Sequence, residues 1–444
     1  MRIPRYKRVV DALAAELRSG RWPVGTRLPT HRELAAREGI ALVTASRVYA
    51  ELEAMGLVSG EQGRGTFVRD LALLAEGVDQ QFVAADALDL RFNHPSIPGQ
   101  ADLLRQALRE LATAGDLDTL LRYQPPRGRV KDRDAVAWHL RRRGLTVDAE
   151  QVLIVSGAQH GLAATAMATL QHGDVVAVDA LTYPGFKVLA QSLGLELVAV
   201  PGTRVGPDLV ALERLCTQRP VRAVYAMPTL HNPLGWVMSA TARARLVAIA
   251  RRHDLIVIED AAYAYLVEDP PPPLAALAPE RTVYVSSLSK SVGTGLRVGF
   301  VVAPGDRVAA IARVIRATTW STPALATEIA CRWLADGTVD RLEARKRADA
   351  SARQAIAREV FDGLRVTGHP ASYFLWLPLA ESARADRIAA TLARQHIAVS
   401  TAEAFAATTQ VPQALRLALG SIGLPDLRQT LSEVRRVVEE DAWR

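Results

Sequence analysis

The chain has 444 residues, of which 49% are hydrophobic and 23% charged, and this composition excludes a disordered or fibrous protein. Arg and Lys number 54 against 47 Asp and Glu, and the net charge of +7 favours an anionic partner such as nucleic acid. The two cysteines, Cys216 and Cys331, lack the spacing of a disulfide framework or a zinc site, so we expect no metal.

The first 70 residues predict three helices followed by a β-hairpin. The first helix has apolar residues at helical spacing, namely Val9, Val10, Leu13 and Leu17. The sequence THRE at 30–33 is typical of a capping box that starts a second helix, which ends at Gly39. A third helix is expected over roughly 43–55 and a hairpin over 57–68, with Arg64 between glycines at or near its tip. This order predicts a winged helix-turn-helix domain over residues 1–70.

The charge of this segment indicates DNA as its partner. Residues 1–70 carry a net charge of +4, more than half of the excess of the whole chain. In a winged helix the third helix enters the major groove, and a helix N-terminus or a basic hairpin tip contacts the backbone or the minor groove. The residues expected to contact DNA are Arg32, Thr44, Ser46, Arg47 and Arg64. The alternative is a solvated three-helix subdomain whose arginines only solubilise it.

The same segment resembles the GntR-type winged helix. The sequences GRWPVGTRLPTHRELAAREGI and VYAELEAMGLVSGEQGRGTFV match the pattern of that family between residues 20 and 68. The turn into the third helix, at 40–44, is more apolar than the family pattern. The resemblance implies binding to double-stranded operator DNA.

The rest of the chain predicts a linker and an α/β domain. Residues 71–89 lack strong periodicity and are interpreted as the linker. Helices then alternate with short apolar runs, as expected for strands of a mostly parallel sheet that is buried on both faces. These runs lie at 152–155, 175–179, 197–200, 223–227, 256–260, 283–286 and 298–302. We assign residues 90–334 to this large domain and 335–444 to an α+β C-terminal subdomain with strands at 373–377 and 415–419.

Only five lysines are present, so chemistry that needs a lysine amine has few candidates. Lys290 follows a buried strand and precedes a glycine-containing loop, which places it at the strand-end crevice where a parallel sheet binds its ligand. Desolvation there would lower the pKa of the amine and free it for Schiff-base chemistry. Lys187, after the turn at 183–185, is the rival near the crevice. The others are expected at the DNA-binding end, for Lys7, and on a charged helical surface, for Lys131 and Lys346.

The other strand ends carry groups that pyridoxal 5'-phosphate would need. Asp260 ends a strand and would pair with the pyridine nitrogen, while the Asn232 amide could donate to the phenolic oxygen. The residues expected to complete the site are Tyr263 beside Asp260, Tyr183 stacked on the ring, and Ser287, Arg297 and the amides of Ala158 and Gln159 at the phosphate. Each feature alone has a plain explanation, such as a helix cap or a turn. Their joint order favours a cofactor site.

Residues 90–440 resemble a fold-type I aminotransferase, and the fusion to a GntR-type winged helix resembles the MocR group of bacterial regulators. The resemblance implies that Lys290 holds the cofactor as an internal aldimine, and that Asn232 and Tyr263 hold its phenolic oxygen. It implies that Tyr123, in RYQPPRG, reaches the phosphate of the partner subunit in a domain-swapped homodimer. It also implies that Arg416, in ALRLALG, binds the carboxylate of an amino-acid-like effector.

Two functions fit these features. In the first, the protein is a transcription regulator, and an amine effector displaces Lys290 to form an external aldimine that changes the affinity for operator DNA. In the alternative, it is an active aminotransferase with an accessory DNA-binding domain. The intact winged helix favours regulation, because an enzyme has no physical use for it, although residual transamination fits the same residues. No apolar stretch is long enough for a signal peptide or membrane span, so we expect a cytoplasmic protein without membrane contact.

Overall fold

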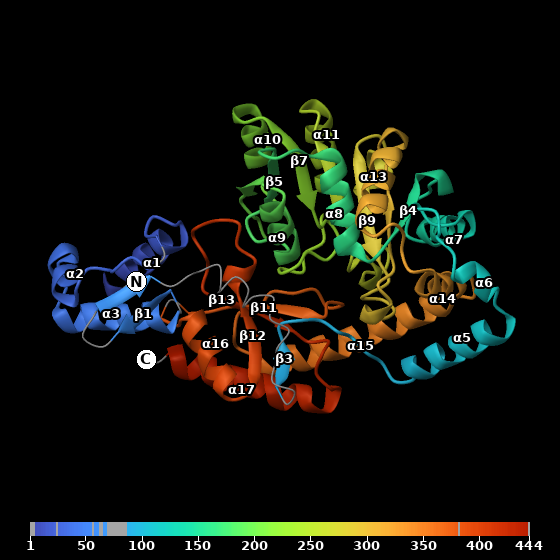
Figure 1. Ribbon diagram of the computed structural model, residues 1–444. Coiled ribbons are helices and arrows are strands. Elements are labelled where there is room, and N and C mark those ends of the chain that lie inside the picture. The colour runs from blue at the N-terminus through green and yellow to red at the C-terminus, as the bar shows by residue number, and fades with distance from the viewer. Residues whose placement is uncertain are drawn as a thin grey trace.

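The computed structural model describes residues 5–23, 25–55, 57–61, 65–68, 87–380 and 382–442. The chain forms three units, and Figure 1 shows the N-terminal unit in blue at one end, beside a C-terminal unit in orange and red. The large domain lies above the C-terminal unit in the same view. Residues 69–86, which include most of the predicted linker, lie outside the described residues.

The N-terminal unit contains the predicted three helices and hairpin. Their bounds are α1 (Arg5–Arg18), α2 (His31–Glu38), α3 (Leu42–Ala54), β1 (Val58–Glu61) and β2 (Gly65–Val68). The capping box is present, because the Thr30 side chain accepts from the Glu33 amide while the Glu33 carboxylate accepts from the Thr30 amide. Apolar residues from the three helices and both strands form a separate core, which includes Leu13, Leu34 and Leu52. The unit is therefore a winged helix.

The large domain is built on a seven-stranded sheet of order β4-β10-β9-β8-β7-β5-β6. The strands are β4 (Val152–Val155), β5 (Val175–Asp179), β6 (Glu196–Val200), β7 (Val221–Ala226), β8 (Ile256–Asp260), β9 (Thr282–Ser287) and β10 (Gly299–Val302). β10 is antiparallel to β4 and β9, whereas the pairs among β5, β6, β7, β8 and β9 are parallel. The prediction of a mostly parallel sheet is confirmed.

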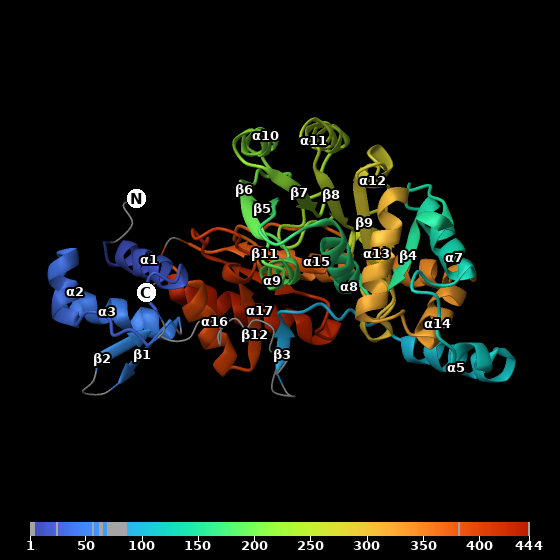
Figure 2. The ribbon, with the colours of Figure 1, turned by 45° about the horizontal axis from the view of Figure 1, so that its top comes forward.

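Helices cover both faces of this sheet, as Figure 2 shows. Leu162 of α8 and Ile311 of α13 pack in one core, and Val136 of α7 and Trp333 of α14 pack in another. The helices are α5 (Gln100–Ala114), α6 (Leu117–Leu120), α7 (Val130–Arg141), α8 (Ala158–Thr169), α9 (Pro184–Ser192), α10 (Leu209–Gln218), α11 (Ala240–Arg252), α12 (Leu274–Leu277), α13 (Gly305–Thr318) and α14 (Ala324–Ala335). Within the described ranges, no helix has the length and hydropathy that crossing a bilayer requires.

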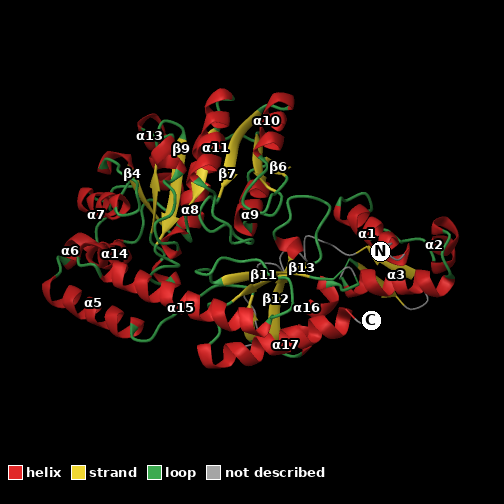
Figure 3. Ribbon diagram, turned by 180° about the vertical axis from the view of Figure 1, so that it is seen from behind, coloured by secondary structure: helices red, strands yellow, loops and turns green. Residues whose placement is uncertain are grey.

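The C-terminal subdomain has a second sheet, of order β11-β13-β12-β3. Its elements are β3 (Leu88–Leu90), β11 (Phe374–Pro378), β12 (Ile397–Thr401), β13 (Ala414–Ala418), α15 (Thr338–Val360), α16 (Ala385–Arg394) and α17 (Leu424–Ala442). Figure 3 shows α17 on the side of this sheet that faces away from the large domain, and α15 running from the large domain to the C-terminal subdomain. The sequence predicted β11 and β13 but neither β12 nor β3, which is only three residues long and pairs with β12 across the fold.

His139 of α7 makes the stability of the large domain sensitive to acid. It is 4% exposed, and burial, aided by Arg143 and Arg142, lowers its pKa from 6.5 to about 3. Between these pH values the unfolded chain binds a proton that the folded chain does not, so stability falls as the pH falls. At about 1.4 kcal/mol per pKa unit, this contribution is roughly 5 kcal/mol. We expect His139→Gln to lose less stability between pH 6.5 and pH 3 than wild type in thermal unfolding. Equal losses would contradict the assignment.

Candidate functional site

The predicted site residues meet at one edge of the large sheet. The strands β5, β7, β8 and β9 are parallel, so their carboxyl ends share this edge. Gly299, at the start of antiparallel β10, pairs with Val155 at the end of β4 and with Ser287 at the end of β9. The segment after β5 contacts the C-terminal subdomain, because the Thr182 amide donates to the Phe405 carbonyl at 2.8 Å. The edge therefore lies at the boundary of the two units.

Lys290 lies in a backbone segment that is held on two sides. Its Nζ donates to the Asn93 carbonyl at 2.7 Å, and its side chain is half-buried. The Lys290 carbonyl accepts from the Tyr265 hydroxyl at 2.8 Å and from Lys346 Nζ at 3.2 Å. The amine is thus at the strand-end boundary, as predicted, and its backbone is fixed.

Lys346 corrects the prediction that it lies on a charged helical surface. It is 0% exposed, and its Nζ donates to the carbonyl oxygens of Pro95, Lys290 and Val292 at 2.9–3.2 Å. Burial lowers its pKa to about 8. The surrounding charges of α15 suggested a solvated helix, but one face of α15 packs beneath the Lys290 segment. Lys346 therefore fixes the backbone around Lys290 through these hydrogen bonds.

The rival amine, Lys187 of α9, is bonded to the C-terminal subdomain. Its Nζ donates to the Glu403 carbonyl at 3.3 Å and to the Ala404 carbonyl at 3.0 Å. Burial lowers the pKa of Lys187. These bonds tie α9 to the segment that follows β12, and they give the amine a bridging contact between the two units.

The start of α8 forms a cradle for an anion with Arg297. Gly157 precedes the helix with a φ of +86°, and an added Cβ would lie 2.6 Å from Arg297 Nη2. Only glycine lets the guanidinium approach so closely. Arg297 also lies 3.4 Å from both the Ser156 carbonyl and the Ser289 hydroxyl. The predicted phosphate residues Ala158, Gln159 and Ser287 lie at the same sheet edge, at the start of α8 and the end of β9.

The residues predicted for the ring are buried at the neighbouring strand ends. Asp260 is 2% exposed, and its Oδ1 accepts from the Ala262 amide at 3.0 Å. Burial raises the pKa of this carboxyl. Asn232 and Tyr263 are 2% and 6% exposed, and Asn232 Oδ1 finds no hydrogen-bond partner among the described residues. Tyr183 precedes α9 with its ring over Gly185, where an added Cβ would lie 2.5 Å from the ring.

Tyr225 of β7 belongs to this group, although the sequence did not indicate it. Its hydroxyl donates to Asp260 Oδ2 at 2.8 Å, and its ring stacks on Phe186 with centroids 4.0 Å apart. A tyrosine in a buried apolar strand is typical of a core residue, and nothing in the single sequence shows that its hydroxyl meets Asp260. Tyr225 therefore orients the carboxylate that is expected to meet a ring nitrogen.

Arg416 of β13 is a buried cation on the opposite side of the boundary. It is 6% exposed, and its Nη1 donates to the Arg91 carbonyl at 2.7 Å. Its guanidinium lies 5.1 Å from the ring centroid of Phe405, and burial lowers its pKa, whereas Tyr263, Asp89 and Tyr183 raise it. No carboxylate of the described residues forms an ion pair with it, and Nε lacks a partner there. The structure thus brings a buried guanidinium, without an ion pair among the described residues, close to Tyr263 and Tyr183.

Together these residues fit pyridoxal 5'-phosphate. The cradle of Gly157 and Arg297 suits a phosphate, and the buried Asp260 suits a ring nitrogen that carries a proton. The open Oδ1 of Asn232 and Nε of Arg416 are buried polar atoms that a bound ligand could satisfy. Tyr123 is the predicted site residue that one chain does not bring here. It is 86% exposed, with its ring beside Trp320 at a centroid distance of 5.2 Å.

The predicted DNA contacts lie on the outer surface of α2 and α3, apart from Arg64, which lies outside the described residues. Arg32, Ser46 and Arg47 are exposed, whereas Thr44 is half-buried. The Arg47 guanidinium lies 4.3 Å from the centre of the Tyr6 ring. The structure also exposes apolar side chains in the first turn of α3, with Val43 81% and Leu42 47% exposed. Because they lie beside the predicted contact residues, Leu42 and Val43 are further candidates for contact with a DNA groove. The sequence showed only that the segment 40–44 is unusually apolar.

Two protein families match this chain. Residues 85–428 match the family described as aminotransferase class I and II, and residues 5–68 match the gntR family of bacterial regulatory proteins. The aminotransferase match includes Lys290, Asp260 and Arg416, and the gntR match covers the winged helix. The family and the fold agree on pyridoxal 5'-phosphate as the cofactor of the large domain.

Similar proteins include both regulators and enzymes. The uncharacterized HTH-type transcriptional regulator YdeF of Bacillus subtilis is 27% identical, over 98% of this chain and 95% of that protein. The HTH-type pyridoxine biosynthesis transcriptional regulator PdxR of Corynebacterium glutamicum is also 27% identical, over 93% of this chain and 91% of its own. The structure of LysN, an α-aminoadipate aminotransferase of Thermus thermophilus complexed with N-(5'-phosphopyridoxyl)-L-leucine, has a TM-score of 0.73 at 24% identity. It covers 83% of this chain and 97% of LysN.

Proposed function

This chain belongs to the class I and II aminotransferase family, and we propose that it is a MocR-type transcription regulator that senses an amine or amino-acid-like effector through pyridoxal 5'-phosphate. One observation carries the sensing part of the proposal. Arg416 holds a buried guanidinium without a carboxylate partner in the described ranges, beside residues predicted for the cofactor. Because a buried charge without a close ion pair is costly, the presence of this guanidinium favours a ligand that supplies a carboxylate.

The proposal assigns a role to each residue of the site. When bound, the cofactor would supply an electrophilic carbon that can form a covalent bond with the Lys290 amine or, in its place, with a primary amine. Asp260, oriented by Tyr225, holds a proton on the ring nitrogen. The remaining roles are Asn232 and Tyr263 at the phenolic oxygen, Tyr183 against the ring, and Ala158, Gln159, Ser287 and Arg297 at the phosphate.

Arg416 then distinguishes amino acids from other amines. A guanidinium can bind a carboxylate through two parallel hydrogen bonds. Because Arg416 belongs to the C-terminal subdomain and Lys290 to the large domain, an amino acid that reaches both would hold the two units together. Such an amino acid would bind more tightly when the two units lie together than when they lie apart, and this difference in affinity is the condition for changing DNA binding.

The proposed active form is a domain-swapped homodimer in the cytoplasm, where it meets operator DNA. Tyr123 supports this form, because it is 86% exposed and is expected to contact the phosphate in the partner subunit. Sedimentation should give the mass of a dimer. Mixing a Lys290→Ala chain with a Tyr123→Ala chain should restore one complete site per mixed dimer, whereas a monomer with unchanged cofactor binding would contradict this assembly.

A panel of amino acids tests the function. Purified holoprotein is mixed with each amino acid, while the visible absorbance of the cofactor, the release of keto acid and the affinity for the protein's own upstream DNA are recorded. We expect one amino acid to shift the absorbance and to change the DNA affinity. Multiple turnovers to keto acid with constant DNA affinity would instead support the alternative, an active aminotransferase with an accessory winged helix.

Arg47 tests the DNA interface. Its guanidinium is exposed on α3, and a lost phosphate contact weakens binding and reduces the salt dependence. For Arg47→Ala we expect DNA affinity to fall about tenfold and the slope of log affinity against log salt to decrease by about one. Fluorescence anisotropy at several salt concentrations measures both. Arg428→Ala, an exposed arginine on α17, is the control, and equal behaviour of the two variants would exclude Arg47 from the interface.

A further inference from the structure

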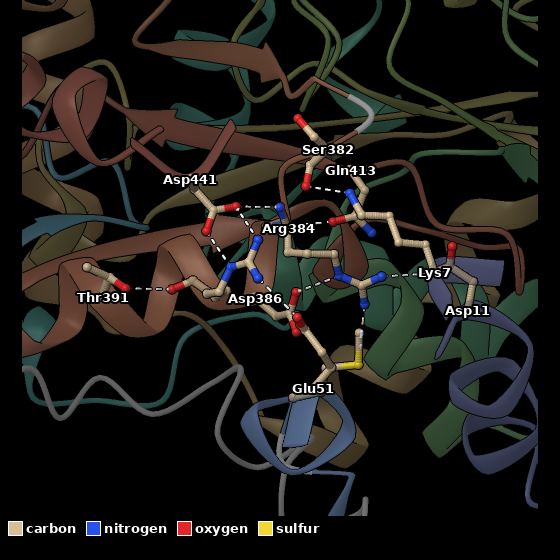
Figure 4. A network of polar contacts seen from close by, with 12 residues as sticks. Lys7, Asp11, Glu51, Ser382, Arg384, Asp386, Thr391, Gln413 and Asp441 are labelled. Atoms are coloured by element: carbon tan, nitrogen blue, oxygen red, sulfur yellow. Dashed lines mark hydrogen bonds and ion pairs between the residues drawn. The ribbon is translucent and has the colours of Figure 1, made fainter. Parts of the chain in front are cut away.

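The winged helix rests on the C-terminal subdomain through a group of charged side chains (Figure 4). They come from α1 and α3 on one side, and from α16, α17 and the residue before α16 on the other. We call this group the docking cluster, and it consists of Lys7, Asp11, Glu51, Arg384, Arg387 and Asp441. No role in DNA or cofactor binding accounts for it.

Two ion pairs of the docking cluster cross between the units. Arg384 Nη1 donates to Asp11 Oδ1 at 2.8 Å, and Arg387 Nη1 donates to Glu51 Oε1 at 3.0 Å. Arg384 and Glu51 are 3% and 7% exposed, whereas the Asp11 side chain is 57% exposed, so the pair of Arg387 with Glu51 is the one largely removed from water. Breaking a buried pair from one side leaves a charge without compensation, which is strongly unfavourable. The contact therefore specifies one orientation of the winged helix.

Lys7 adds a third link, because its Nζ donates to the Ser382 carbonyl. It is 5% exposed, and burial lowers its pKa. The charges that face it are balanced, since Arg384 and Arg387 lower this pKa whereas Asp441 and Glu51 raise it. The docking cluster is thus a mixed network rather than a single pair.

Asp441 of α17 fixes the two arginines within the C-terminal subdomain. The Arg384 amide and Arg387 Nη2 both donate to Asp441 Oδ2, each at 2.9 Å. Apolar residues of α16 and α17, including Ile388 and Val434, share one core with the sheet of the subdomain. A movement of this subdomain therefore carries the arginines, and through them the winged helix, as one body.

A short route connects the docking cluster with Arg416. Gln413 immediately precedes β13, and its Oε1 accepts from the Ala385 amide at 2.8 Å, where α16 begins. Along β13, side chains alternate between the two faces of the sheet. Leu415 and Leu417 pack in the core that contains α16 and α17, whereas Arg416 lies on the other face, over Phe405. The strand that carries the proposed effector ligand is therefore fastened to the start of α16.

Docking leaves the DNA-reading end of α3 open. Glu51 lies in the last turn of α3, and Met55, just after the helix, contacts Arg384 through its sulfur at 3.5 Å. Val43 and Arg47, in the first turns, are exposed. The docked winged helix can thus meet DNA while its direction is set by the C-terminal subdomain.

We propose that the docking cluster transmits effector binding from the C-terminal subdomain to the winged helix, by holding the winged helix to α16 and α17 while that subdomain moves. This inference rests on the proposed function for the existence of an effector. Figure 4 shows the contacts of the docking cluster within one chain. If a domain-swapped dimer exchanges its winged helices, the same contacts form between the two copies.

Charge reversal tests the proposal in the full-length holoprotein. Asp441 would face a glutamate at position 387, so all variants are made in an Asp441→Asn background. In this background Glu51→Lys and Arg387→Glu each place like charges together, whereas the double variant restores an opposite pair. Arg428→Glu reverses an exposed charge elsewhere on α17 and is the matched control. The panel consists of the proteinogenic amino acids and β-alanine. The probe is the member of this panel that most shifts the cofactor absorbance of the wild-type protein.

The readouts are the amino-acid dependence of the cofactor absorbance and the ratio of DNA affinities with and without the amino acid. We expect the single variants to keep the wild-type absorbance titration, which also shows that the site is folded. Their DNA-affinity ratio should fall from about fivefold or more to below about twofold, and the double variant should recover it. A ratio that single reversals leave unchanged, or that the double variant does not recover, would overturn the proposal.

Hydrogen exchange separates this inference from the proposed function. If no amino acid changes the DNA affinity of wild type, the proposed sensing fails, and the transmission inference fails with it. Docking itself is tested in either case. Single reversals should increase amide exchange in α1 and at the start of α16, and the double variant should restore protection. Unchanged exchange in the single variants would show that the docking cluster does not hold the winged helix.

Discussion

Replacing Lys290 with alanine is expected to abolish covalent attachment of the cofactor. The chain offers the Lys290 amine at the strand-end boundary, while Lys346 and Tyr265 fix the backbone behind it. We expect Lys290→Ala to lose the visible absorbance of the bound cofactor, and borohydride reduction of wild type to label the peptide that contains Lys290, as seen by mass spectrometry. DNA binding by the winged helix should persist, because α2 and α3 lie in a separate core.

Lys187→Ala is the matched control. Lys187 is also half-buried, but it is bonded to the carbonyls of Glu403 and Ala404. The control should keep the absorbance and the labelled peptide. If the Lys290 variant keeps its absorbance and the Lys187 variant loses it, the attachment site is Lys187.

Arg416→Met is expected to stabilise the protein without effector and to remove its response to amino acids. The guanidinium is buried without a carboxylate partner in the described chain, and methionine fills similar space between Phe374 and Phe405 without a charge. Replacing buried ionic groups with well-packed apolar side chains is often neutral or stabilises by about 1–4 kcal/mol. Thermal unfolding should show a higher Tm than wild type, whereas the amino-acid concentration that shifts the cofactor absorbance should rise by about tenfold or more.

Arg416→Lys is the companion variant, because lysine keeps the charge but not the two-bond geometry. It should respond weakly to amino acids and should gain no stability. A lower Tm for the methionine variant, with an unchanged response to amino acids, would make Arg416 a structural residue.

The sequence predicted those helices and strands whose residue pattern lies within the element itself. The strands at 152–155, 175–179 and 256–260 are runs of apolar residues, and the structure contains them with the same bounds. β3 has only three residues and β12 ends in the polar pair Ser400 and Thr401, and the two strands pair across most of the chain, Leu88 with Ile397. The THRE capping box was confirmed because both of its hydrogen bonds lie within four residues.

The site residues were predicted when they lay at strand ends and missed when only tertiary packing revealed them. Asp260 and Lys290 follow buried strands, whereas Tyr225 lies inside one and resembles a core residue. Lys346 was wrongly placed because its neighbours are charged, although its own face of α15 is buried. The docking cluster was missed for the same reason, since Arg384 and Arg387 resemble solvated helix charges until α1 and α3 lie beside them.

The affinity for the amino acid in the presence and absence of DNA tests the central claim most directly. Coupling between two sites is reciprocal, so DNA must change the amino-acid affinity by the same factor by which the amino acid changes the DNA affinity. Titration of the cofactor absorbance, with and without saturating upstream DNA, measures this factor. We predict a change of about fivefold or more that matches the factor from DNA titrations. An amino-acid affinity that saturating DNA leaves unchanged would contradict the account, because the two domains would then bind their ligands independently.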